Sequence, residues 1–469
     1  MTKLKLRGKD LKKIGYPEAT SIGLAMQIMH KHYKRTSKEE ALTLLKEIMD
    51  TPENFKDHEI LSPIAHEFIE VEKVIQYEET LLDRSLPYKM YGGKEIDDTA
   101  KIQMDLAMKL PIVKAGALMA DAHTGYGLPI GGVLATENTI IPYGVGVDIG
   151  CRMCLTLYNI PIKYLKKHNH KLKFMLREHT RFGMRQVFED ADVDHPIFER
   201  NEFREIPFVR DLKDKAYSQI GTSGGGNHFV EFGEVELLEN NEFGLPAGSY
   251  VGILSHSGSR GMGARIAQHY TRIAMSKCLL PKSAKNLAWL DLNSEEGQEY
   301  WLAMNLAGDY ASACHHDIHK RLSKALGEKP VFMVENHHNF AWKEKLADGT
   351  NVIVHRKGAT PAGKGVLGII PGSMTAPGYI IKGKGSIESI NSASHGAGRQ
   401  MSRRRAKESL TQSFVKKYLK EHGITLIGGG LDEAPQAYKD ITKVMNYQKE
   451  LVEVLGKFTP KIVRMAKDE

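Results

Sequence analysis

From about residue 90 onward, the chain consists of short apolar runs that each end in a polar turn rich in glycine or histidine. Runs of this length, bounded by turn residues, are typical of buried strands in a sheet. The clearest of them are residues 116–120, 131–135, 250–254, 331–334, 352–354 and 379–381. They predict an α/β (α+β) fold with a large mixed β-sheet core and surrounding helices. Because a rigid sheet holds its connecting loops in place, these turns are the first candidates for a functional site.

The first 85 residues differ from the rest because their apolar residues recur at helical spacing. Residues 19–32 predict one helix, and Ser37 followed by Glu40 has the capping-box pattern that opens a second one. Pro52 should end that second helix, since the residue before a proline disfavours helical backbone. We therefore expect an N-terminal helical extension over residues 1–85 and one large domain over residues 86–469.

Within the large domain, further stretches have helical character. Residues 163–210 are charged and predict a helical insertion, and residues 281–326 predict a largely helical segment. Residues 406–421 predict a basic amphipathic helix, and residues 441–458 predict a last helix after a glycine turn at 428–430. Basic clusters at residues 166–173 and 177–185 make the insertion a candidate nucleic-acid surface. The alternative for these clusters is a solvated helix face.

Composition narrows the class of protein and its compartment. The 469 residues contain no apolar run long enough to span a membrane, and the N-terminus lacks the apolar region of a signal peptide. Four cysteines are too few for a disulfide scaffold, so thiols in a reducing, cytoplasmic compartment are expected. The net charge of +8 is compatible with a polyanionic partner but does not require one. These patterns leave the oligomeric state open, and a monomer is compatible with them.

Four of the turns carry side chains that bind transition metals. In chain order, their candidate ligands are Asp148 with Cys151, then His228, His256 and His338. A lone histidine is more often an ordinary core or surface residue, but four such turns together favour a common site. One thiol, one carboxylate and three imidazoles suit one or two divalent ions of the manganese-to-zinc series. The alternative for Cys151 is a redox pair with Cys154, although its glycine-rich surroundings favour metal binding.

Residues 392–399, Ser-Ala-Ser-His-Gly-Ala-Gly-Arg, place His395 among residues too small to crowd it. Backbone amides in such a run can approach an anion closely, and Arg399 offers a planar fork for phosphate oxygens. The interpretation is a histidine held against a phosphate and able to attack it. The alternative is a glycine-rich turn with a surface histidine. Other small-residue turns that suit phosphate lie at 221–226, 355–360 and 370–374. The first of them matches neither the P-loop nor the dinucleotide fingerprint.

Taken in order, these motifs resemble the RtcB family of RNA-splicing ligases over roughly residues 90–469. The motifs that carry the resemblance are Asp121-Ala-His123-Thr-Gly-Tyr-Gly, Gly146-Val-Asp148-Ile-Gly-Cys151, Gly226-Asn227-His228-Phe229, His256-Ser-Gly-Ser-Arg260, His337-His338-Asn339, His355-Arg-Lys-Gly-Ala359, Pro371-Gly-Ser-Met374 and His395-Gly-Ala-Gly-Arg399. Ala120 and Ala122 stand where the family usually has proline and valine, and Thr222-Ser-Gly-Gly-Gly replaces its usual Thr-Leu-Gly-x-Gly. The resemblance is therefore to a divergent branch, with an N-terminal extension outside the family core.

The resemblance implies a catalytic domain over residues 86–469 that acts as a GTP- and Mn²⁺-dependent RNA ligase. Such an enzyme joins an RNA 3′-phosphate or 2′,3′-cyclic phosphate end to a 5′-hydroxyl end. By resemblance, His395 is the nucleophile that forms a covalent histidine–GMP intermediate. Two Mn²⁺ ions are implied at Asp148, Cys151, His228, His256 and His338, with Cys151 bridging.

The resemblance also implies a set of residues that face the guanylate. They are Asn227, Glu231, Ser373, Ala397, Gly398 and Tyr438, and Lys467 matches a guanine-reading lysine if the alignment takes a gap. An alternative function keeps the metal centre and changes the task to RNA or DNA end repair or to nucleotidyl capping of 3′-phosphates. A third reading is a non-catalytic RNA-binding protein that retains the metal site.

Overall fold

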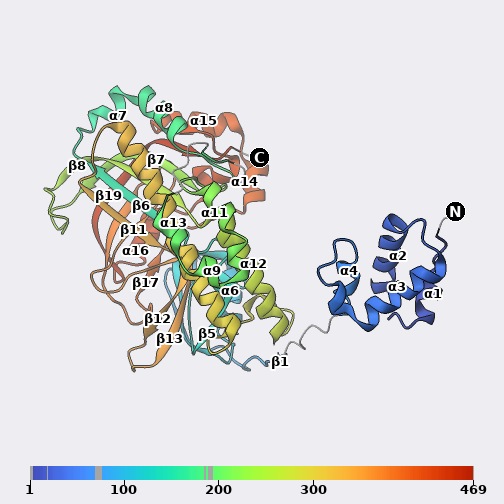
Figure 1. Cartoon of the computed structure of the whole chain (residues 1–469). Coiled ribbons are helices and arrows are strands. Elements are labelled where there is room, and N and C mark those ends of the chain that lie inside the picture. Colours follow the sequence, from blue (N-terminus) through green and yellow to red (C-terminus); the bar gives the residue numbers. More distant parts are fainter. Residues whose placement is uncertain (1–3, 18–19, 69–75, 184–185, 189–193, 468–469) are drawn as a thin grey trace. The chain divides into compact units, whose positions relative to one another are not determined.

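A computed structural model describes residues 4–17, 20–68, 76–183, 186–188 and 194–467 (Figure 1). The chain divides into two compact units, Met1–Ile75 and Gln76–Glu469. Residues 76–85, expected in the N-terminal extension, belong to the larger unit in this division. In that unit, the strand Tyr77–Glu78 (β1) pairs with Cys278–Leu279 (β9).

The N-terminal unit is helical and has a core of its own. Its elements are α1 (Gly8–Lys13), α2 (Thr20–His32), α3 (Lys38–Asp50), the 3-10 helix η1 (Pro52–Phe55) and α4 (Ser62–Ala65). Leu11, Met29, Leu45 and Ile48 are fully buried in this core. The predicted capping box is confirmed, because the Ser37 side chain accepts from the Glu40 N–H and the Glu40 carboxylate accepts from the Ser37 N–H.

The larger unit is built on two sheets. The eight-stranded sheet has the order β11-β6-β8-β7-β19-β16-β15, with β18 paired to β19. Its strands are β11 (Phe332–His337), β6 (Arg152–Tyr158), β8 (Gly248–Ser257), β7 (Phe229–Leu237), β19 (Val452–Met465), β16 (Gly378–Gly383), β15 (Leu367–Ile370) and β18 (Thr425–Ile427). All the pairs along this path are antiparallel, and only the β18–β19 pair is parallel, so the sheet is mixed.

The second sheet has five strands in the order β12-β13-β4-β3-β2. They are β12 (Asn339–Lys345), β13 (Asn351–Lys357), β4 (Leu128–Thr136), β3 (Val113–Tyr126) and β2 (Lys89–Met90). Two short pairs complete the set, β14 (Ala359–Pro361) with β17 (Ser392–Ser394) and β5 (Thr139–Ile140) with β10 (Leu290–Asp291). Every one of the six predicted apolar runs lies at least largely within a strand of these two sheets. The predicted mixed sheet with surrounding helices is therefore confirmed.

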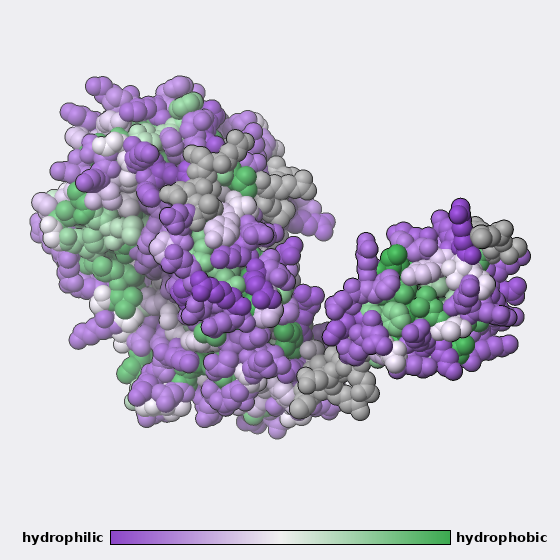
Figure 2. Space-filling model, in the orientation of Figure 1, coloured by the Kyte–Doolittle hydropathy of each residue, from purple (hydrophilic) through white to green (hydrophobic). Residues whose placement is uncertain are grey.

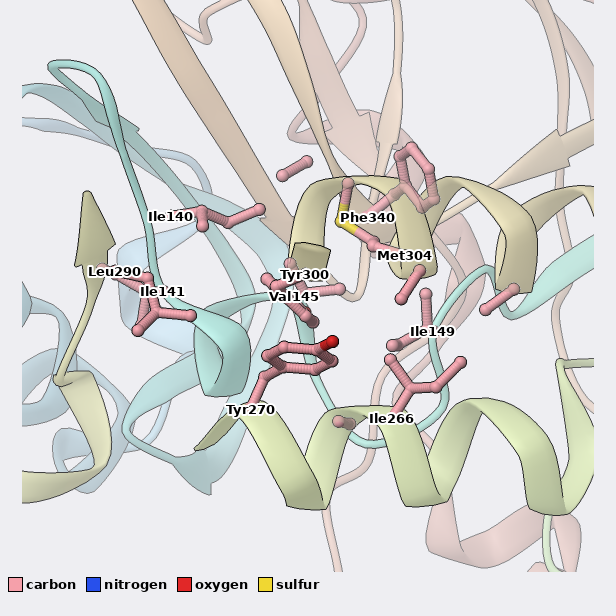
Figure 3. Packing of buried hydrophobic residues seen from close by; sticks show 14 of the residues in the cluster. Ile140, Ile141, Val145, Ile149, Ile266, Tyr270, Leu290, Tyr300, Met304 and Phe340 are labelled. Carbon is pink, nitrogen blue, oxygen red and sulfur yellow. The ribbon is translucent and has the colours of Figure 1, made fainter. Parts of the chain in front are cut away.

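Helices cover the sheets and supply the largest apolar cluster. The longer ones are α5 (Asp98–Ala107), α8 (Asn169–His179), α12 (Arg260–Lys277) and α13 (Glu295–Leu326), and the shorter ones are α6 (Pro142–Val145), α7 (Lys163–Lys167), α9 (Glu202–Glu205), α10 (Pro207–Arg210) and α11 (Lys213–Gln219). Figure 3 shows Ile266 and Tyr270 of α12 facing Tyr300 and Met304 of α13. Ile149 packs into the same cluster, which anchors the loop that carries Asp148 and Cys151.

Two predictions for the C-terminal part are wrong in detail. Residues 406–421 form two helices, α14 (Arg403–Ser409) and α15 (Gln412–Glu421), because Leu410 is extended and the Thr411 side chain caps α15 by accepting from the Phe414 N–H. The helix predicted over residues 441–458 stops early, as α16 (Ile441–Asn446), and β19 begins at Val452. Phe458 and Ile462 of β19 are fully buried in the sheet, so tertiary pairing outweighs the local spacing there.

The predicted helical insertion is present only in its first part. Helices α7 and α8 cover residues 163–179 with Leu172 and Leu176 buried, whereas residues 194–210 form only short turns of helix. Arg185 of the predicted basic cluster lies outside the described residues. The visible face of the molecule is mainly hydrophilic, and hydrophobic residues form small areas on it (Figure 2). No helix in the described part of the chain is both long enough and apolar enough to cross a membrane.

Candidate active site

The antiparallel order of four strands brings the candidate metal ligands to one edge of the large sheet. Strands β6 and β7 begin at this edge and strands β8 and β11 end there, as shown by the pairing of Arg152 with both Ser257 and His337. Phe229, the first residue of β7, pairs with His256. Turns that are far apart in sequence therefore meet in space, because chain direction alternates from strand to strand.

At this edge, Cys151 lies between the two halves of a cluster. Its Sγ lies 3.2 Å from Nε2 of His256 and 3.5 Å from Nε2 of His228. On one side, Nε2 of His256 lies 3.3 Å from Nε2 of His338, and on the other, Nε2 of His228 lies 3.0 Å from Oδ2 of Asp148. The cluster thus contains two groups of three possible metal ligands, Cys151–His256–His338 and Asp148–Cys151–His228, that share the thiol.

Local contacts hold these side chains in position. Gly258 leaves room for Asp148, since a Cβ atom at this glycine would lie 2.0 Å from the carboxylate Oδ1. The Nδ1 of His256 hydrogen-bonds the Asn227 carbonyl oxygen at 3.0 Å, which points Nε2 at Cys151. Such a bond to the far ring nitrogen selects the tautomer and orientation of a metal-binding imidazole.

The electrostatics of the cluster suit a cation. Burial lowers the pKa of His256 to about 3 and that of His338 well below its ordinary value, so both imidazoles are neutral. The pKa of the Cys151 thiol lies well above its usual range. Burial is the main cause, and the negative charge of Asp148 raises this pKa further. A bound divalent cation would favour the thiolate, and neutral imidazole and thiolate are the forms that bind metal. The donor set therefore fits a divalent ion.

His395 follows β17 and lies next to the cluster, with its ring centroid 4.9 Å from that of His338. Its Nδ1 lies 2.7 Å from Oδ2 of Asp121, a fully buried residue of β3. The same carboxylate oxygen accepts from the N–H groups of His395 and Gly396 at 3.0 and 3.2 Å. Burial acts to raise the pKa of Asp121, but the charge and hydrogen bond of His395 leave it below its ordinary value. An ionised Asp121 thus holds Nδ1–H, and Nε2 has no hydrogen-bond partner among the described residues.

A cavity of about 770 Å³ joins the cluster to His395. Its lining includes all five candidate metal ligands, His395, and the predicted guanylate-facing residues Asn227, Glu231, Ser373, Ala397, Gly398 and Tyr438. Lys467 is exposed and is not among the described residues that line the cavity. The volume lies within the range of small-molecule sites. Gly398 lines the cavity with a φ of +73° and packs closely against β3, where a Cβ atom would lie 2.1 Å from the Asp121 carbonyl oxygen.

Two ionisable residues of the cavity have surroundings that the sequence did not indicate. The guanidinium of Arg399 donates to the carbonyl oxygens of Met401 and Asp432 and pairs with Glu433, so protein acceptors occupy the fork expected for phosphate. Glu231 is buried, and burial raises its pKa well above the ordinary value. A neutral Glu231 could both donate and accept hydrogen bonds to a ligand.

Sequence reasoning missed the roles that Asp121 and Lys357 have in this geometry. Asp121 interrupts an apolar run, and a lone acid inside a buried strand was the available signal. Lys357 lines the cavity at the end of β13, with its Nζ donating to the carbonyl oxygens of Tyr126 and Tyr143. Burial lowers the pKa of Lys357 to about 7, so this lysine can be neutral or charged near neutral pH.

A second buried cluster contains Cys154, His315 and His319. The Ser255 hydroxyl lies 2.6 Å from Nδ1 of His315 and 2.8 Å from Nε2 of His319, and Thr156 Oγ1 lies 2.8 Å from Nδ1 of His319. Hydroxyls therefore already satisfy these ring nitrogens. Cys154 and Cys151 are free thiols in different clusters, an arrangement that offers no support for a redox pair.

Buried neutral histidines make the stability of the larger unit sensitive to acid. Burial lowers the pKa of His319 to about 3 and that of His355 to about 4. Below pH 6.5 the unfolded histidines bind protons that the native ones do not, so stability should fall as the pH drops from 6.5 toward 4. Each histidine should contribute a loss of about 1.4 kcal/mol per pH unit. All three tryptophans lie in the larger unit, so the urea midpoint followed by tryptophan fluorescence measures this unit alone.

The variant His355→Gln tests whether one of these buried neutral histidines contributes to the loss of stability in acid. In the native structure Nε2 of His355 accepts from the Ile141 N–H at 2.9 Å, and Nδ1 donates to the Leu134 carbonyl oxygen at 3.2 Å. A glutamine amide can make both hydrogen bonds but does not titrate. The midpoint of this variant should therefore fall less steeply between pH 6.5 and pH 5. An identical pH slope in the two proteins would contradict the assignment.

Comparison with known proteins gives a consistent result. The sequence profile of the family described as "tRNA-splicing ligase RtcB" matches residues 103–206 and 166–466. The RNA-splicing ligase RtcB of Escherichia coli strain K12 is 32% identical over 407 residues, which cover 80% of this chain and 97% of that protein. The tRNA-splicing ligase RtcB of Nanoarchaeum equitans is 31% identical over 452 residues, covering 80% of this chain and 94% of that protein.

A eukaryotic relative extends the comparison. The RNA-splicing ligase RtcB homolog 1 of Entamoeba dispar is 33% identical over 408 residues, covering 72% of this chain and 76% of that protein. The profile match includes Asp121 in β3 and His395 in the turn after β17. It also includes every loop that carries one of the five candidate metal ligands, the metal-type cluster. On this evidence the chain belongs to the RtcB family.

Proposed function

We propose that this protein is an RNA ligase that uses GTP and Mn²⁺ to join RNA 3′-phosphate or 2′,3′-cyclic phosphate ends to 5′-hydroxyl ends. The observation that carries the proposal is the position of His395. Its Nδ1 is held by a buried carboxylate, and its side chain lines the same cavity as the metal-type cluster. An imidazole fixed through one nitrogen presents the other as a nucleophile, and a nearby cation site suits a triphosphate.

In the first step, Nε2 of His395 attacks the α-phosphorus of GTP. A nitrogen–phosphorus bond forms, the bond between the α-phosphorus and the bridging oxygen breaks, and pyrophosphate leaves. Asp121 orients the ring through Nδ1–H and stabilises the positive charge that develops on the imidazole, as a buried carboxylate does for a catalytic histidine elsewhere. The product is a covalent histidine–GMP intermediate.

The metal-type cluster supports this step. The five side chains of the cluster would hold the two Mn²⁺ ions, which would supply Lewis-acid chemistry at the triphosphate. These residues are Asp148, Cys151, His228, His256 and His338. Paired divalent ions neutralise phosphate charge and orient an in-line displacement. The chain itself supplies the neutral imidazoles, the fixed ring of His256 and the room for Asp148 beside Gly258.

In the following steps, GMP passes from His395 to the RNA 3′-phosphate, where it forms a phosphoanhydride. The RNA 5′-hydroxyl then attacks this activated phosphorus and GMP leaves, so a phosphodiester forms. A 2′,3′-cyclic end must first be opened by water to give the 3′-phosphate. The predicted guanylate-facing residues line the same cavity as His395, which supports a role for them in binding the nucleotide.

Mass spectrometry of the protein after incubation with GTP and Mn²⁺ tests the proposal directly. One added GMP should be found on the tryptic peptide that contains His395, and it should be lost in acid, since phosphoramidates are acid-labile. Labelled RNA with 3′-phosphate and 5′-hydroxyl ends should then be sealed. A GMP adduct without sealing, but with a GMP-capped 3′ end, would point to the capping alternative instead. Absence of any adduct in the metal-loaded protein would reject both.

Asp121→Asn should slow formation of the GMP adduct by about 10²- to 10⁴-fold, judging from the loss of an orienting carboxylate in other catalytic sites. The asparagine amide oxygen can still accept from the backbone N–H groups of His395 and Gly396 and from Nδ1–H, since one carboxylate oxygen accepts all three bonds in the native structure. The substitution therefore removes mainly the negative charge that stabilises the developing imidazolium. Single-turnover labelling with α-³²P-GTP measures the rate, and equilibrium binding measures GTP affinity. The rate should fall much more than the affinity.

Asp98→Asn serves as the matched control, because Asp98 is an exposed residue at the start of α5 that pairs with Lys101. This variant should label at the wild-type rate. If Asp121→Asn lost GTP affinity and rate by the same factor, Asp121 would be a binding residue rather than one that positions His395.

A further inference from the structure

The N-terminal unit carries a basic surface that the family comparison leaves unexplained. The family profile matches from residue 103 onward, so this unit lies outside it. The basic surface consists of seven exposed side chains, Lys5, Arg7, Lys9, Lys13, Lys31, Lys34 and Arg35. These residues come from two segments, residues 5–13, which include α1, and residues 31–35, which include the end of α2 and the turn that follows.

The fold of the unit brings these two segments together. The Leu4 N–H donates to the Lys34 carbonyl oxygen at 3.0 Å, which joins the chain before α1 to the turn after α2. Lys38, at the start of α3, pairs with the buried Asp10 of α1 at 2.8 Å. Asp10 is thus engaged by Lys38. None of the seven basic-surface side chains has a carboxylate at ion-pair distance among the residues that the structure describes.

Among the described residues of the unit, the exposed acidic side chains lie later in the chain. Exposed carboxylates follow from the start of α3, at Glu39, Glu40, Glu47, Asp50, Glu53, Asp57, Glu59 and Glu67. Among the described residues from 5 to 35, the exposed ionisable side chains are therefore all basic. A group of basic side chains without paired carboxylates attracts a polyanion.

We propose that the basic surface binds the phosphate backbone of the RNA on which the larger unit acts, an inference that rests on the proposed function. Lysine and arginine side chains that contact phosphates release counterions and so give salt-dependent affinity without sequence preference. A membrane surface fits less well. The exposed large hydrophobic side chains among the described residues all lie beyond residue 75, so this unit offers none for insertion. Binding through a tethered unit raises the effective concentration of an RNA end at the active site.

The test compares two double variants of the full-length protein that change the net charge equally. Lys9→Glu with Lys34→Glu alters one residue from each segment of the basic surface. Lys46→Glu with Lys56→Glu alters two exposed lysines of the same unit outside it, one on α3 and one that pairs weakly with Glu53. Fluorescence anisotropy of a labelled 5′-hydroxyl RNA, without GTP or Mn²⁺, should show roughly tenfold weaker binding for the first variant. The salt slope of log Kd should fall by about one per lost contact for that variant only.

GMP labelling and vesicle binding, measured alongside the anisotropy, separate the possible outcomes. Both variants should form the GMP adduct at the wild-type rate, so loss of RNA binding with normal labelling supports the proposal. Equal binding and equal salt slopes in the two variants would overturn it. Binding of the wild type to phosphatidylserine vesicles, lost in the Lys9→Glu, Lys34→Glu variant while RNA binding is retained, would also overturn it. Failure of the proposed function would instead appear as absent labelling in every protein, whatever the anisotropy shows.

Discussion

His395→Ala should abolish the transfer of radiolabel from α-³²P-GTP to the protein and reduce RNA sealing by on the order of 10⁴-fold or more, as removal of a catalytic nucleophile does. The alanine has no atom that can form a bond to phosphorus. The cavity should otherwise persist, because β17 remains paired with β14 and Asp121 still accepts from two backbone N–H groups. GTP binding should therefore survive with a modest change in Kd.

Two companion measurements make this prediction specific. The neighbouring His337 stacks on Trp342 with ring centroids 5.0 Å apart and is not among the described residues that line the cavity. His337→Phe keeps the stacked ring and should label normally. RNA whose 3′-phosphate already carries GMP does not need His395, so the His395→Ala variant should still seal it in the presence of Mn²⁺. Labelling of His395→Ala with GTP would show that another residue is the nucleophile.

Cys151→Ala should remove both metal binding and guanylylation. Both groups of three ligands depend on this thiol, so one substitution weakens two ion sites at once. Loss of a neighbouring group that only orients a metal ligand costs 10- to 100-fold in affinity, and loss of the ligand itself should cost at least about 100-fold. Metal content after dialysis against micromolar Mn²⁺, measured by mass spectrometry, should fall from two ions per chain toward none.

Cys154→Ala is the matched control, since it removes a buried thiol three residues away. Cys154 groups with His315 and His319 and not with the cluster of Cys151. This variant should retain its metal and its labelling with GTP. Equal losses in the two variants would support a shared cysteine pair and would contradict the division into two clusters.

The strands were predictable from the sequence, whereas the last helix was not. Apolar runs such as 250–254 and 379–381 are bounded by glycine and polar turns, so local pattern and final structure agree. Residues 452–458 have helical spacing of their own, but Phe458 becomes a buried residue of β19 between β7 and β16. A strand in the interior of a sheet is decided by its neighbours, and these lie far away in the sequence.

In the candidate site, too, local sequence predicted some features and tertiary contacts decided others. The residue types that suit metal and phosphate chemistry stand out locally, because a thiol, a carboxylate and several histidines occur in glycine-rich turns. Asp121 gave a weaker signal, a single acid inside an apolar run. Its role depends on a 2.7 Å contact with His395, 274 positions later in the chain. Likewise, Arg399 appeared free to bind an anion until the fold placed Glu433 and Tyr438 beside it.

The sequence by itself therefore determined the fold class, the strands, the first helices and the chemical character of the site. Each of these depends on side chains within a few positions of one another. Only the tertiary structure decided that the four metal-type turns share one sheet edge, that Cys151 belongs to both ligand groups, and that His395 is held by Asp121. The antiparallel order of β11, β6, β8 and β7 is the physical reason, since it brings two strand starts and two strand ends to the same edge.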